Sequence, residues 1–279
     1  MQKSTSMFGK ITILCLLILG TVRISASHEN AIRVIHGTDV KEDEFPYVIV
    51  LIRKNAFFVS RLCTGSMLTP YWGLSAGHCK ETFTPEYSIY VWYGNFSLSP
   101  FYTENYIPVV EWNLHPSYRV LNFKNHPDLI VDNDVSLFRI EPELRLASYA
   151  RLSALDRDSL LGHSVIYIGG GTTKTVGGAN ENFQRPLKKG EGSITSCDFE
   201  IRLKSKHVAC IKPKCDLRFQ FPWYGDSGGP LIHDEQIVGV CSFVVNASDF
   251  FQGAFVPISP YVDWISYVIN SKKIEKLKR

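Results

Sequence analysis

The chain has 279 residues, of which 45% are hydrophobic and 20% are charged, so it can bury the core of one large domain or of two modest ones. Four of its 30 Lys and Arg residues and one of its 27 Asp and Glu residues lie in the first 33 positions, which leaves 26 of each sign and accounts for the net charge of +3. This balance gives no indication of a nucleic-acid partner, because proteins that bind nucleic acids present an excess of positive charge.

The first 26 residues are typical of a secretory signal peptide. Lys3 and Lys10 precede the apolar run Ile11–Val22, and the small residues Ser25 and Ala26 stand at a plausible cleavage site. An N-terminal membrane anchor is the alternative, but the run is shorter than the ~20 residues that cross a bilayer. Because no later stretch is long and apolar enough either, the sequence predicts a secreted, extracellular protein without stable membrane insertion.

Cysteine usage agrees with export. Cys15 lies in the signal peptide, and an even number remains in an oxidising compartment, which predicts three disulfides. No Cys-x-x-Cys pair occurs, so neither a zinc ribbon nor a thioredoxin-type redox site is expected, and we predict no metal and no cofactor. The triplets that begin at Asn95 and Asn246 match the acceptor pattern for N-glycosylation. The remaining cysteines are Cys63, Cys79, Cys197, Cys210, Cys215 and Cys241.

From Phe45 onward, short apolar runs rich in β-branched and aromatic residues alternate with Gly, Pro, Asn and Asp. Their spacing is typical of an all-β sandwich or barrel. Residues 172–192 are rich in Gly, Thr, Asn and Lys, and we expect them to form an exposed loop. The clearest expected strands are residues 47–52, 88–93, 164–168 and 236–243.

Helical periodicity is clear only near the C-terminus. Residues 260–270 begin at a proline and are expected to form a helix with four apolar residues on one face, Val262, Ile265, Val268 and Ile269. The tail at 271–279 holds five basic residues against Glu275. We interpret it as a solvated helix end, with binding to a heparin-like polyanion or a membrane surface as the alternative.

Three segments far apart in the sequence carry residues suited to acyl transfer. A serine hydroxyl needs a base to remove its proton, and a third group must orient the base. Ser227 stands in the run Gly225–Pro230, whose glycines allow backbone N–H groups to point at a developing oxyanion. His78 follows an apolar run and precedes a cysteine, and Asp134 precedes another short apolar segment. Any one of them could be structural, but all three together predict one catalytic site.

The same segments resemble the motifs of the chymotrypsin-like (trypsin-like) serine protease family. The resemblance runs from about Arg33 to the C-terminal helix, and it rests on Ala76–Cys79, Asn133–Val135, Gly225–Pro230 and Tyr261–Ile265. It implies an all-β fold of two packed six-stranded antiparallel β-barrels with a C-terminal α-helix. The implied protease domain is residues 34–279, with barrel halves at roughly 34–145 and 146–258, a helix at 259–270 and the basic tail.

The resemblance also implies a role for each residue. Ser227 is expected to attack the peptide carbonyl, His78 to act as base and then as acid, and Asp134 to orient the imidazole. The backbone N–H groups of Gly225 and Ser227 would form the oxyanion hole, with Ser242 behind Asp134. The expected activity is that of a serine endopeptidase, with protein or peptide substrates and protein inhibitors as partners. A catalytically silent homologue that binds or regulates other proteins is the alternative.

Zymogens of this family are cut after a basic residue, and the freed amine pairs with the acid that precedes the nucleophile. Residues 33–37, Arg-Val-Ile-His-Gly, correspond to the family's Arg-Ile-Val-Gly-Gly. We therefore predict a propeptide at residues 27–33, cleavage after Arg33 by an activating protease, and burial of the Val34 ammonium against Asp226. The alternative is that Arg33 is an ordinary loop residue.

The family's pattern of disulfides fits this chain only in part. Many relatives have a cysteine four residues before the nucleophile, where this chain has Trp223. The expected pairs are Cys63–Cys79, Cys197–Cys210 and, from the two cysteines that remain, Cys215–Cys241 near the floor of the specificity pocket.

The residues expected around the specificity pocket depart from the trypsin pattern. Trypsin-like members have an aspartate six residues before the nucleophile, where Phe221 stands, and Asp216 would serve only if its loop folded back. The residue after Phe243 is usually glycine in open pockets and is Val244 here, which would narrow the pocket. We therefore expect an apolar P1 residue rather than Lys or Arg. The full expected set is Asp216, Phe221, Ser242, Phe243, Val244 and Gly253, and the family's Gly-Trp-Gly motif becomes Gly169–Gly171.

Overall fold

A computed structural model describes residues 34–55, 59–81, 88–122, 129–171, 186–205, 207–214, 220–247 and 250–277. Several expectations from the sequence lie outside these residues. They are the signal peptide at 1–26, the propeptide with Arg33, Cys215 and Asp216, and the side chain of Asn246.

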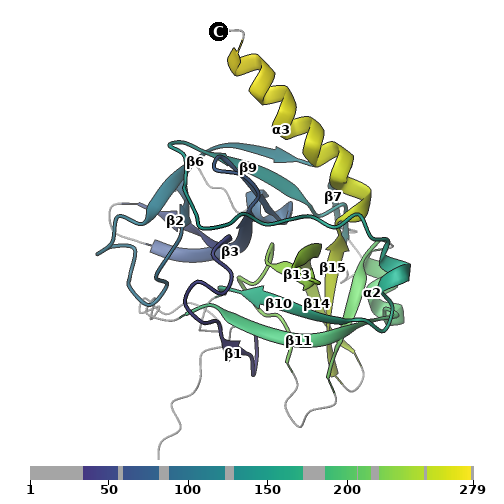
Figure 1. Cartoon of the computed structure of the whole chain (residues 1–279). Helices are drawn as coiled ribbons and strands as arrows, with labels where there is room; N and C mark the ends of the chain where they lie inside the picture. Colours follow the sequence, from purple (N-terminus) through teal and green to yellow (C-terminus); the bar gives the residue numbers. More distant parts are fainter. Residues whose placement is uncertain are drawn as a thin grey trace, which may run out of the picture. The chain divides into compact units, whose positions relative to one another are not determined.

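Six strands form the first barrel, which closes in the order β2-β3-β4-β9-β6-β5 with antiparallel neighbours (Figure 1). Five consecutive residues of β2, Val48–Ile52, are buried, so both faces of this strand are covered by other parts of the protein. The strands are β2 (Val48–Lys54), β3 (Val59–Met67), β4 (Trp72–Ser75), β5 (Ser88–Trp92), β6 (Tyr106–Leu114) and β9 (Ser136–Ile140).

The second barrel consists of six strands that run in the order β11-β10-β13-β14-β15-β12 and close through pairing between β11 and β12. The predicted fold of two six-stranded antiparallel barrels is therefore confirmed. One short strand crosses the expected boundary between the halves, because β1 (Thr38–Asp39) adds to β11 of the second barrel. The six strands are β10 (Ser164–Gly169), β11 (Lys188–Thr195), β12 (Ala209–Pro213), β13 (Pro230–His233), β14 (Gln236–Ala247) and β15 (Phe250–Pro257).

The sequence expectation of a loop through residue 192 is wrong at its C-terminal end, where β11 begins at Lys188. Barrel closure explains the difference, because β11 pairs with β10 on one side and with β12 on the other. Its glycines suit this position: a Cβ on Gly190 would lie 2.3 Å from the ring of the buried Tyr167. Composition therefore indicated a loop where tertiary pairing requires a strand.

The C-terminal helix α3 (Val262–Leu277) follows a 3₁₀ turn, η2 (Ser259–Tyr261), and continues beyond the expected end at residue 270. The expected apolar face is present. Ile265 is buried, and Val262, Val268 and Ile269 pack half-buried against the main core. None of the described helices combines the length and the hydropathy needed to cross a membrane.

The other described elements are short. Two strands, β7 (Arg119–Asn122) and β8 (Leu129–Asp132), form a hairpin of their own. Three helical turns connect strands: α1 (His78–Glu81), η1 (Arg157–Leu160) and α2 (Phe199–Lys204).

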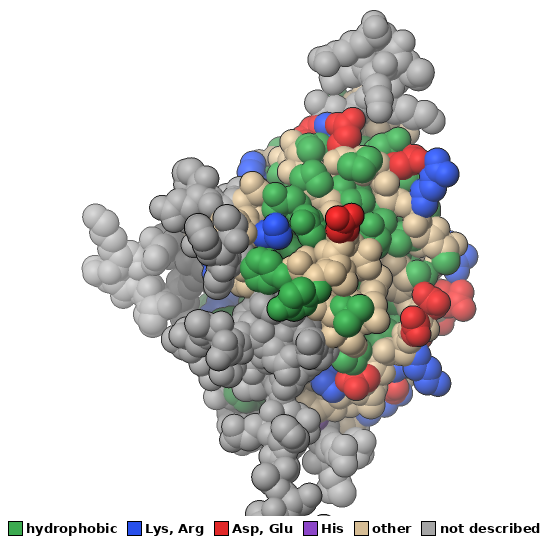
Figure 2. Space-filling model, turned by 90° about the vertical axis from the view of Figure 1, so that its left-hand side faces the viewer, with side chains coloured by type: hydrophobic (Ala, Val, Ile, Leu, Met, Phe, Trp, Pro, Cys, Tyr) green, Lys and Arg blue, Asp and Glu red, His purple; other side chains and the backbone are tan. Residues whose placement is uncertain are grey.

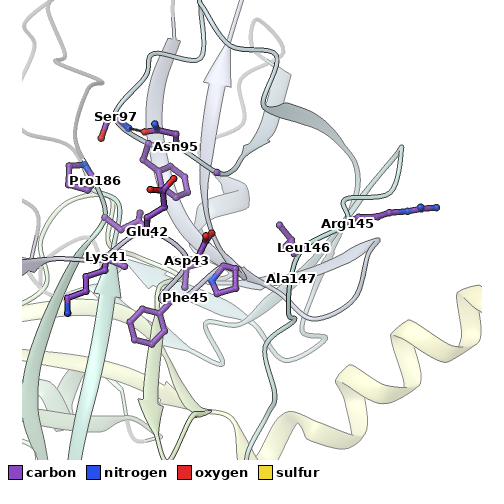
Figure 3. A pocket seen from close by; sticks show the side chains of 16 residues that line it. Lys41, Glu42, Asp43, Phe45, Asn95, Ser97, Arg145, Leu146, Ala147 and Pro186 are labelled. Atoms are coloured by element: carbon purple, nitrogen blue, oxygen red, sulfur yellow. Dashed lines mark hydrogen bonds between the residues drawn. The ribbon is translucent and has the colours of Figure 1, made fainter.

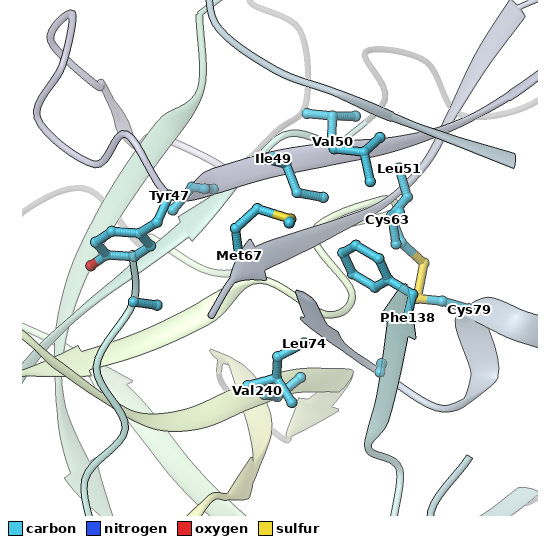
Figure 4. Packing of buried hydrophobic residues seen from close by; sticks show 14 of the residues in the cluster. Tyr47, Ile49, Val50, Leu51, Cys63, Met67, Leu74, Cys79, Phe138 and Val240 are labelled. Atoms are coloured by element: carbon cyan, nitrogen blue, oxygen red, sulfur yellow. A yellow bond between two sulfur atoms is a disulfide. The ribbon is translucent and has the colours of Figure 1, made fainter. Parts of the chain in front are cut away.

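The main core contains buried residues from both barrels, such as Leu74 of β4 and Val240 of β14 (Figure 4). The disulfide between Cys63 and Cys79 lies in this core beside Phe138 and ties β3 to α1 (Figure 4). A second disulfide joins Cys197 to Cys210. Both are pairs that the sequence led us to expect.

The expected pair Cys215–Cys241 is wrong, because Cys241 is a free, buried thiol. Neighbouring residues of a strand point to opposite faces. Ser242 points toward Asp134, and Cys241 accordingly lies in a second cluster with Tyr167 and Phe255. The thiol therefore faces the interior of the second barrel.

Charged side chains on the described surface are mixed in sign. Figure 2 shows basic and acidic side chains interspersed on one face of the protein. Several of them form exposed or half-exposed ion pairs, such as Lys188 with Asp39 and Lys214 with Glu191. This distribution agrees with the balance of charge in residues 34–279.

Candidate active site

The structure brings His78 and Asp134 together from separate elements of the first barrel. His78 begins α1, three positions after β4 ends at Ser75, and Asp134 lies two positions before β9, which pairs with β4. The Nδ1 atom of His78 lies 2.7 Å from Oδ2 of Asp134, and the backbone N–H of His78 donates to Oδ1 at 2.8 Å. Two contacts to the two carboxylate oxygens fix both the position and the ring orientation of the histidine.

Asp134 is almost completely buried, at 1% exposure, and a third group satisfies it from the second barrel. The hydroxyl of Ser242, on β14, donates to Oδ2 at 2.5 Å. Burial by itself raises the pKa of Asp134, but the charge of His78 and the hydrogen bonds from His78 and Ser242 outweigh it. The pKa of the carboxyl therefore lies below its ordinary value, and Asp134 is an anion at neutral pH.

The first barrel holds the backbone of Ser227 close to the segment that carries His78. The carbonyl oxygen of Ser227 accepts a 2.8 Å hydrogen bond from the backbone N–H of Thr64. The same oxygen is 3.9 Å from Sγ of Cys79, the residue that follows His78. The disulfide from Cys79 to Cys63 joins these contacts, since Cys63 precedes Thr64 on β3. The backbone of Ser227 from the second barrel therefore contacts the same strand and disulfide that adjoin His78, and Asp134 is bonded to Ser242 of the second barrel.

Asp226, the residue before Ser227, turns its buried carboxylate toward the start of the described chain. Oδ2 accepts hydrogen bonds from the backbone nitrogens of Val34 at 2.9 Å and Trp223 at 2.8 Å. Oδ1 accepts one from Gly171 at 2.9 Å. A Cβ on Gly169 would lie 2.0 Å from Oδ1, so this carboxylate requires glycine at that position. Val34 is itself fully buried.

Comparison with known proteins agrees with this geometry. The family model described as Trypsin matches residues 34–265. The chain belongs to the trypsin family of serine proteases. In the mosquito Anopheles gambiae, serine protease SP24D is 28% identical over 237 residues, which cover 84% of this chain and 80% of that protein. Human kallikrein-8 is 28% identical over 271 residues, covering 94% of this chain and 96% of that protein.

Two further relatives extend the comparison. Bovine chymotrypsin-like elastase family member 1 is 27% identical over 261 residues, which cover 87% of this chain and 92% of that protein. Among solved structures, neuropsin, a serine protease expressed in the limbic system of mouse brain, aligns with a TM-score of 0.62 at 21% identity. That alignment covers 85% of this chain and all of neuropsin, and it supports the fold.

This trypsin-family chain fills the region of its expected specificity pocket with aromatic side chains. Phe221 is buried and stacks on Phe251 of β15, with ring centroids 4.3 Å apart and planes inclined by 21°. Trp223 packs edge-on against both rings. Pro222 covers Gly253, where a Cβ would lie 3.0 Å from the proline ring. Of the described residues in the expected set, Phe221 belongs to this aromatic group, and Gly253 lies under Pro222 and pairs with Val244. Ser242 instead faces Asp134, and Phe243 packs against the separate cluster around Ile201.

Two residues at this site were missed by sequence reasoning. Thr64 contacts the loop that carries Ser227 through its backbone and its side chain, and Phe251 forms one side of the aromatic stack. A signal for Thr64 was its position next to Cys63, which was expected to form a disulfide with Cys79, the residue after His78. The signal for Phe251 was its position two residues before Gly253.

Other concave or metal-like features lie apart from this chemistry. A surface pocket of about 420 Å³ is lined by residues such as Lys41, Phe45, Asn95 and Arg145, and it includes none of the three predicted catalytic residues (Figure 3). Among the described residues, Cys63, His78 and Cys79 bring possible ligand atoms together, but the two sulfur atoms are bonded to each other and are therefore not thiolates.

Proposed function

We propose that this trypsin-family protein is a secreted serine endopeptidase, made as a zymogen, that hydrolyses peptide bonds through Ser227, His78 and Asp134. The observation that carries the proposal is the 2.7 Å contact between His78 Nδ1 and the buried Asp134, close to a Ser227 whose backbone carbonyl is held by Thr64. A carboxylate that binds Nδ1 leaves Nε2 as the basic nitrogen of the imidazole.

Each residue then has a defined task in acyl transfer. Nε2 of His78 takes the proton of the Ser227 hydroxyl as the oxygen attacks the carbonyl carbon of the substrate. The negative charge on the carbonyl oxygen is stabilised by the backbone N–H groups of Gly225 and Ser227. His78 then gives its proton to the departing amine, and Asp134 stabilises the imidazolium in between. Water releases the acyl group by the same steps in reverse.

The contact between Val34 and Asp226 supports activation by cleavage after Arg33. In the uncut chain the nitrogen of Val34 is a neutral peptide N–H, and cleavage would convert it into an ammonium group at the same place. A buried carboxylate gains far more from a cation than from a peptide dipole. We therefore propose that an activating protease, by cutting after Arg33, locks Asp226 and with it the loop around Ser227.

The aromatic floor and Val244 support a P1 residue that is small and apolar. The stacked rings of Phe221 and Phe251 offer no carboxylate for a Lys or Arg side chain. We expect their bulk to shorten the pocket as well. Elastases, named among the relatives, share this chain's family. We further propose protein inhibitors as partners and an N-glycan at Asn95, which is exposed.

Active-site labelling of the purified chain tests the proposed function. The chain is cut after Arg33, its new N-terminus is sequenced, and a fluorophosphonate probe is added before and after the cut. Labelling is expected only after the cut, equally in wild type and in a control with exposed Ser266→Ala on α3, and not in Ser227→Ala. An N-terminus at Val34 without labelling would instead favour the catalytically silent homologue.

A further inference from the structure

The side chain of Thr64 makes contacts that neither the motifs nor the relatives' names indicate. Thr64 lies on β3 of the first barrel and is completely buried. Its hydroxyl donates a 2.9 Å hydrogen bond to the carbonyl oxygen of Gly225, in addition to the 2.8 Å bond from its backbone N–H to the carbonyl oxygen of Ser227. One residue of the first barrel therefore holds both residues whose N–H groups are proposed to bind the oxyanion.

The hydroxyl of Thr64 is also an acceptor. The backbone N–H of Gly170 donates to Oγ1 at 2.9 Å, and the carbonyl oxygen of Gly170 accepts a 2.8 Å bond from Nη1 of Arg61, on the same strand as Thr64. A hydroxyl has a single proton, so a donor at Gly170 directs that proton toward Gly225. A Cβ at Gly170 would lie 2.5 Å from Val50, which shows how closely the two barrels approach here.

These contacts fix the peptide groups around Ser227. The carbonyl of Gly225 belongs to the peptide group that joins Gly225 to Asp226. The carbonyl of Ser227 belongs to the peptide group that joins Ser227 to Gly228. The peptide between them carries the N–H of Ser227, so its orientation is determined once both neighbours are held. Asp226 anchors the same loop from the other side, through Val34, Gly171 and Trp223.

We infer that Thr64 is a positioning residue, whose hydroxyl holds the Gly225–Ser227 loop in the orientation that binds the oxyanion. The inference rests on the proposed function and names a group that acts through the backbone rather than on the substrate. The oxyanion is present only as the transition state is approached. A small rotation of this loop therefore reduces kcat more than it changes substrate binding.

Two pairs of variants isolate the hydroxyl. Thr64→Val replaces it by a methyl group of similar size, and Thr64→Ala differs from Thr64→Ser only by the hydroxyl. In the cleaved enzyme we expect kcat to fall about tenfold to a hundredfold in Thr64→Val, with KM nearly unchanged. In the second pair, kcat should be lower in Thr64→Ala than in Thr64→Ser. The affinity for a peptide aldehyde inhibitor, whose adduct with Ser227 carries the oxyanion, should fall by a similar factor.

A control variant on the same strand accounts for the general loss of a buried hydroxyl. Ser66 is as buried as Thr64, and within the described residues its hydroxyl has no hydrogen-bond partner. Ser66→Ala should leave kcat and aldehyde affinity within about twofold of wild type. A kcat in folded Thr64→Val that matches Ser66→Ala, or a loss confined to KM, would overturn the inference.

Hydrogen exchange tests the same inference without any catalysis. In an inactive Ser227→Ala background, Thr64→Val and Thr64→Ala should exchange the backbone amides of residues 224–228 faster, while Thr64→Ser and Ser66→Ala should not. Unchanged exchange in both hydroxyl-free variants contradicts the role of Thr64. Failure of the proposed function is distinct, because it appears as a correctly cut wild type that neither turns over substrate nor is labelled.

Discussion

The backbone nitrogen of Val34 lies 2.9 Å from Oδ2 of Asp226, although 192 positions separate the two residues in the sequence. Both are buried, so a charge on either one has no water to stabilise it. This contact joins the start of the described chain to the residue directly before Ser227. Any change in the charge of the Val34 nitrogen is therefore transmitted to the loop that carries Ser227.

Asp226→Asn should abolish activation without preventing cleavage. A buried ammonium opposite a neutral amide loses its counter-charge, and breaking such a pair costs about 3–5 kcal/mol, so we expect turnover to fall by a hundredfold or more. The measurement is kcat/KM of protein whose N-terminus has been sequenced as Val34. Asp39→Asn removes an exposed carboxylate that pairs with Lys188 and should retain full activity. More than a tenth of wild-type activity in Asp226→Asn would contradict the switch.

The buried pair of Asp134 and His78 should make stability depend on pH in the acid range. The folded pKa of Asp134 lies below its ordinary value of about 3.9, so the folded state binds this proton less readily than the unfolded chain. Its contribution to stability is then complete above about pH 4 and is lost as the pH falls through the lower folded pKa. Urea midpoints measured from pH 6 to pH 2 should decline less steeply at the acid end in Asp134→Asn than in wild type.

The same substitution should also reduce turnover, since an amide opposite Nδ1 no longer selects the tautomer that leaves Nε2 basic. A loss of kcat by about 10⁴-fold is expected, as this substitution causes in other triads of the family. Equal acid slopes for wild type and Asp134→Asn, or nearly unchanged kcat, would contradict the assigned role of the carboxylate.

Cys241 should be unreactive in the native protein. Burial raises the pKa of its thiol well above the ordinary range, and the carboxylates of Asp226 and Asp134 raise it further, so the reactive thiolate is scarce. Iodoacetamide at pH 8 is expected to modify Cys241 only after unfolding, as mass spectrometry of digests would show. A Cys215–Cys241 peptide pair in an unreduced digest would restore the pairing that the structure contradicts.

Removal of the ring at Phe221 should deepen the specificity pocket. Wild type is expected to prefer Ala or Val at P1, whereas Phe221→Ala should raise kcat/KM for Leu or Phe at P1 by about tenfold relative to Ala. A P1-diverse peptide library reads out the change, with melting temperatures to confirm that the variant is folded. Strong cleavage after Lys or Arg by the wild type would overturn the proposed preference.

Much of the fold and of the site could be predicted because the informative residues lie in short local patterns. Each of the motifs around His78, Asp134 and Ser227 is an uninterrupted stretch of sequence. Short apolar runs separated by turn residues indicate an all-β protein. Strand β11 was missed because its glycines and lysines resemble a loop, and only pairing with β10 and β12 makes it a strand. The predicted partner of Cys241 was wrong because the number of cysteines left unpaired says nothing about which face of β14 a side chain occupies.

The sequence by itself determined the candidate chemistry, through a serine, a histidine and an aspartate in three recognisable segments and a cysteine beside the histidine. Only the tertiary structure decided what supports them. The hydroxyl of Thr64 reaches Gly170 and Gly225, which are 106 and 161 positions away, and the ring of Phe221 finds Phe251. Such contacts depend on how two separately closed barrels pack against each other, and the sequence around each residue does not specify which side chains meet at that interface.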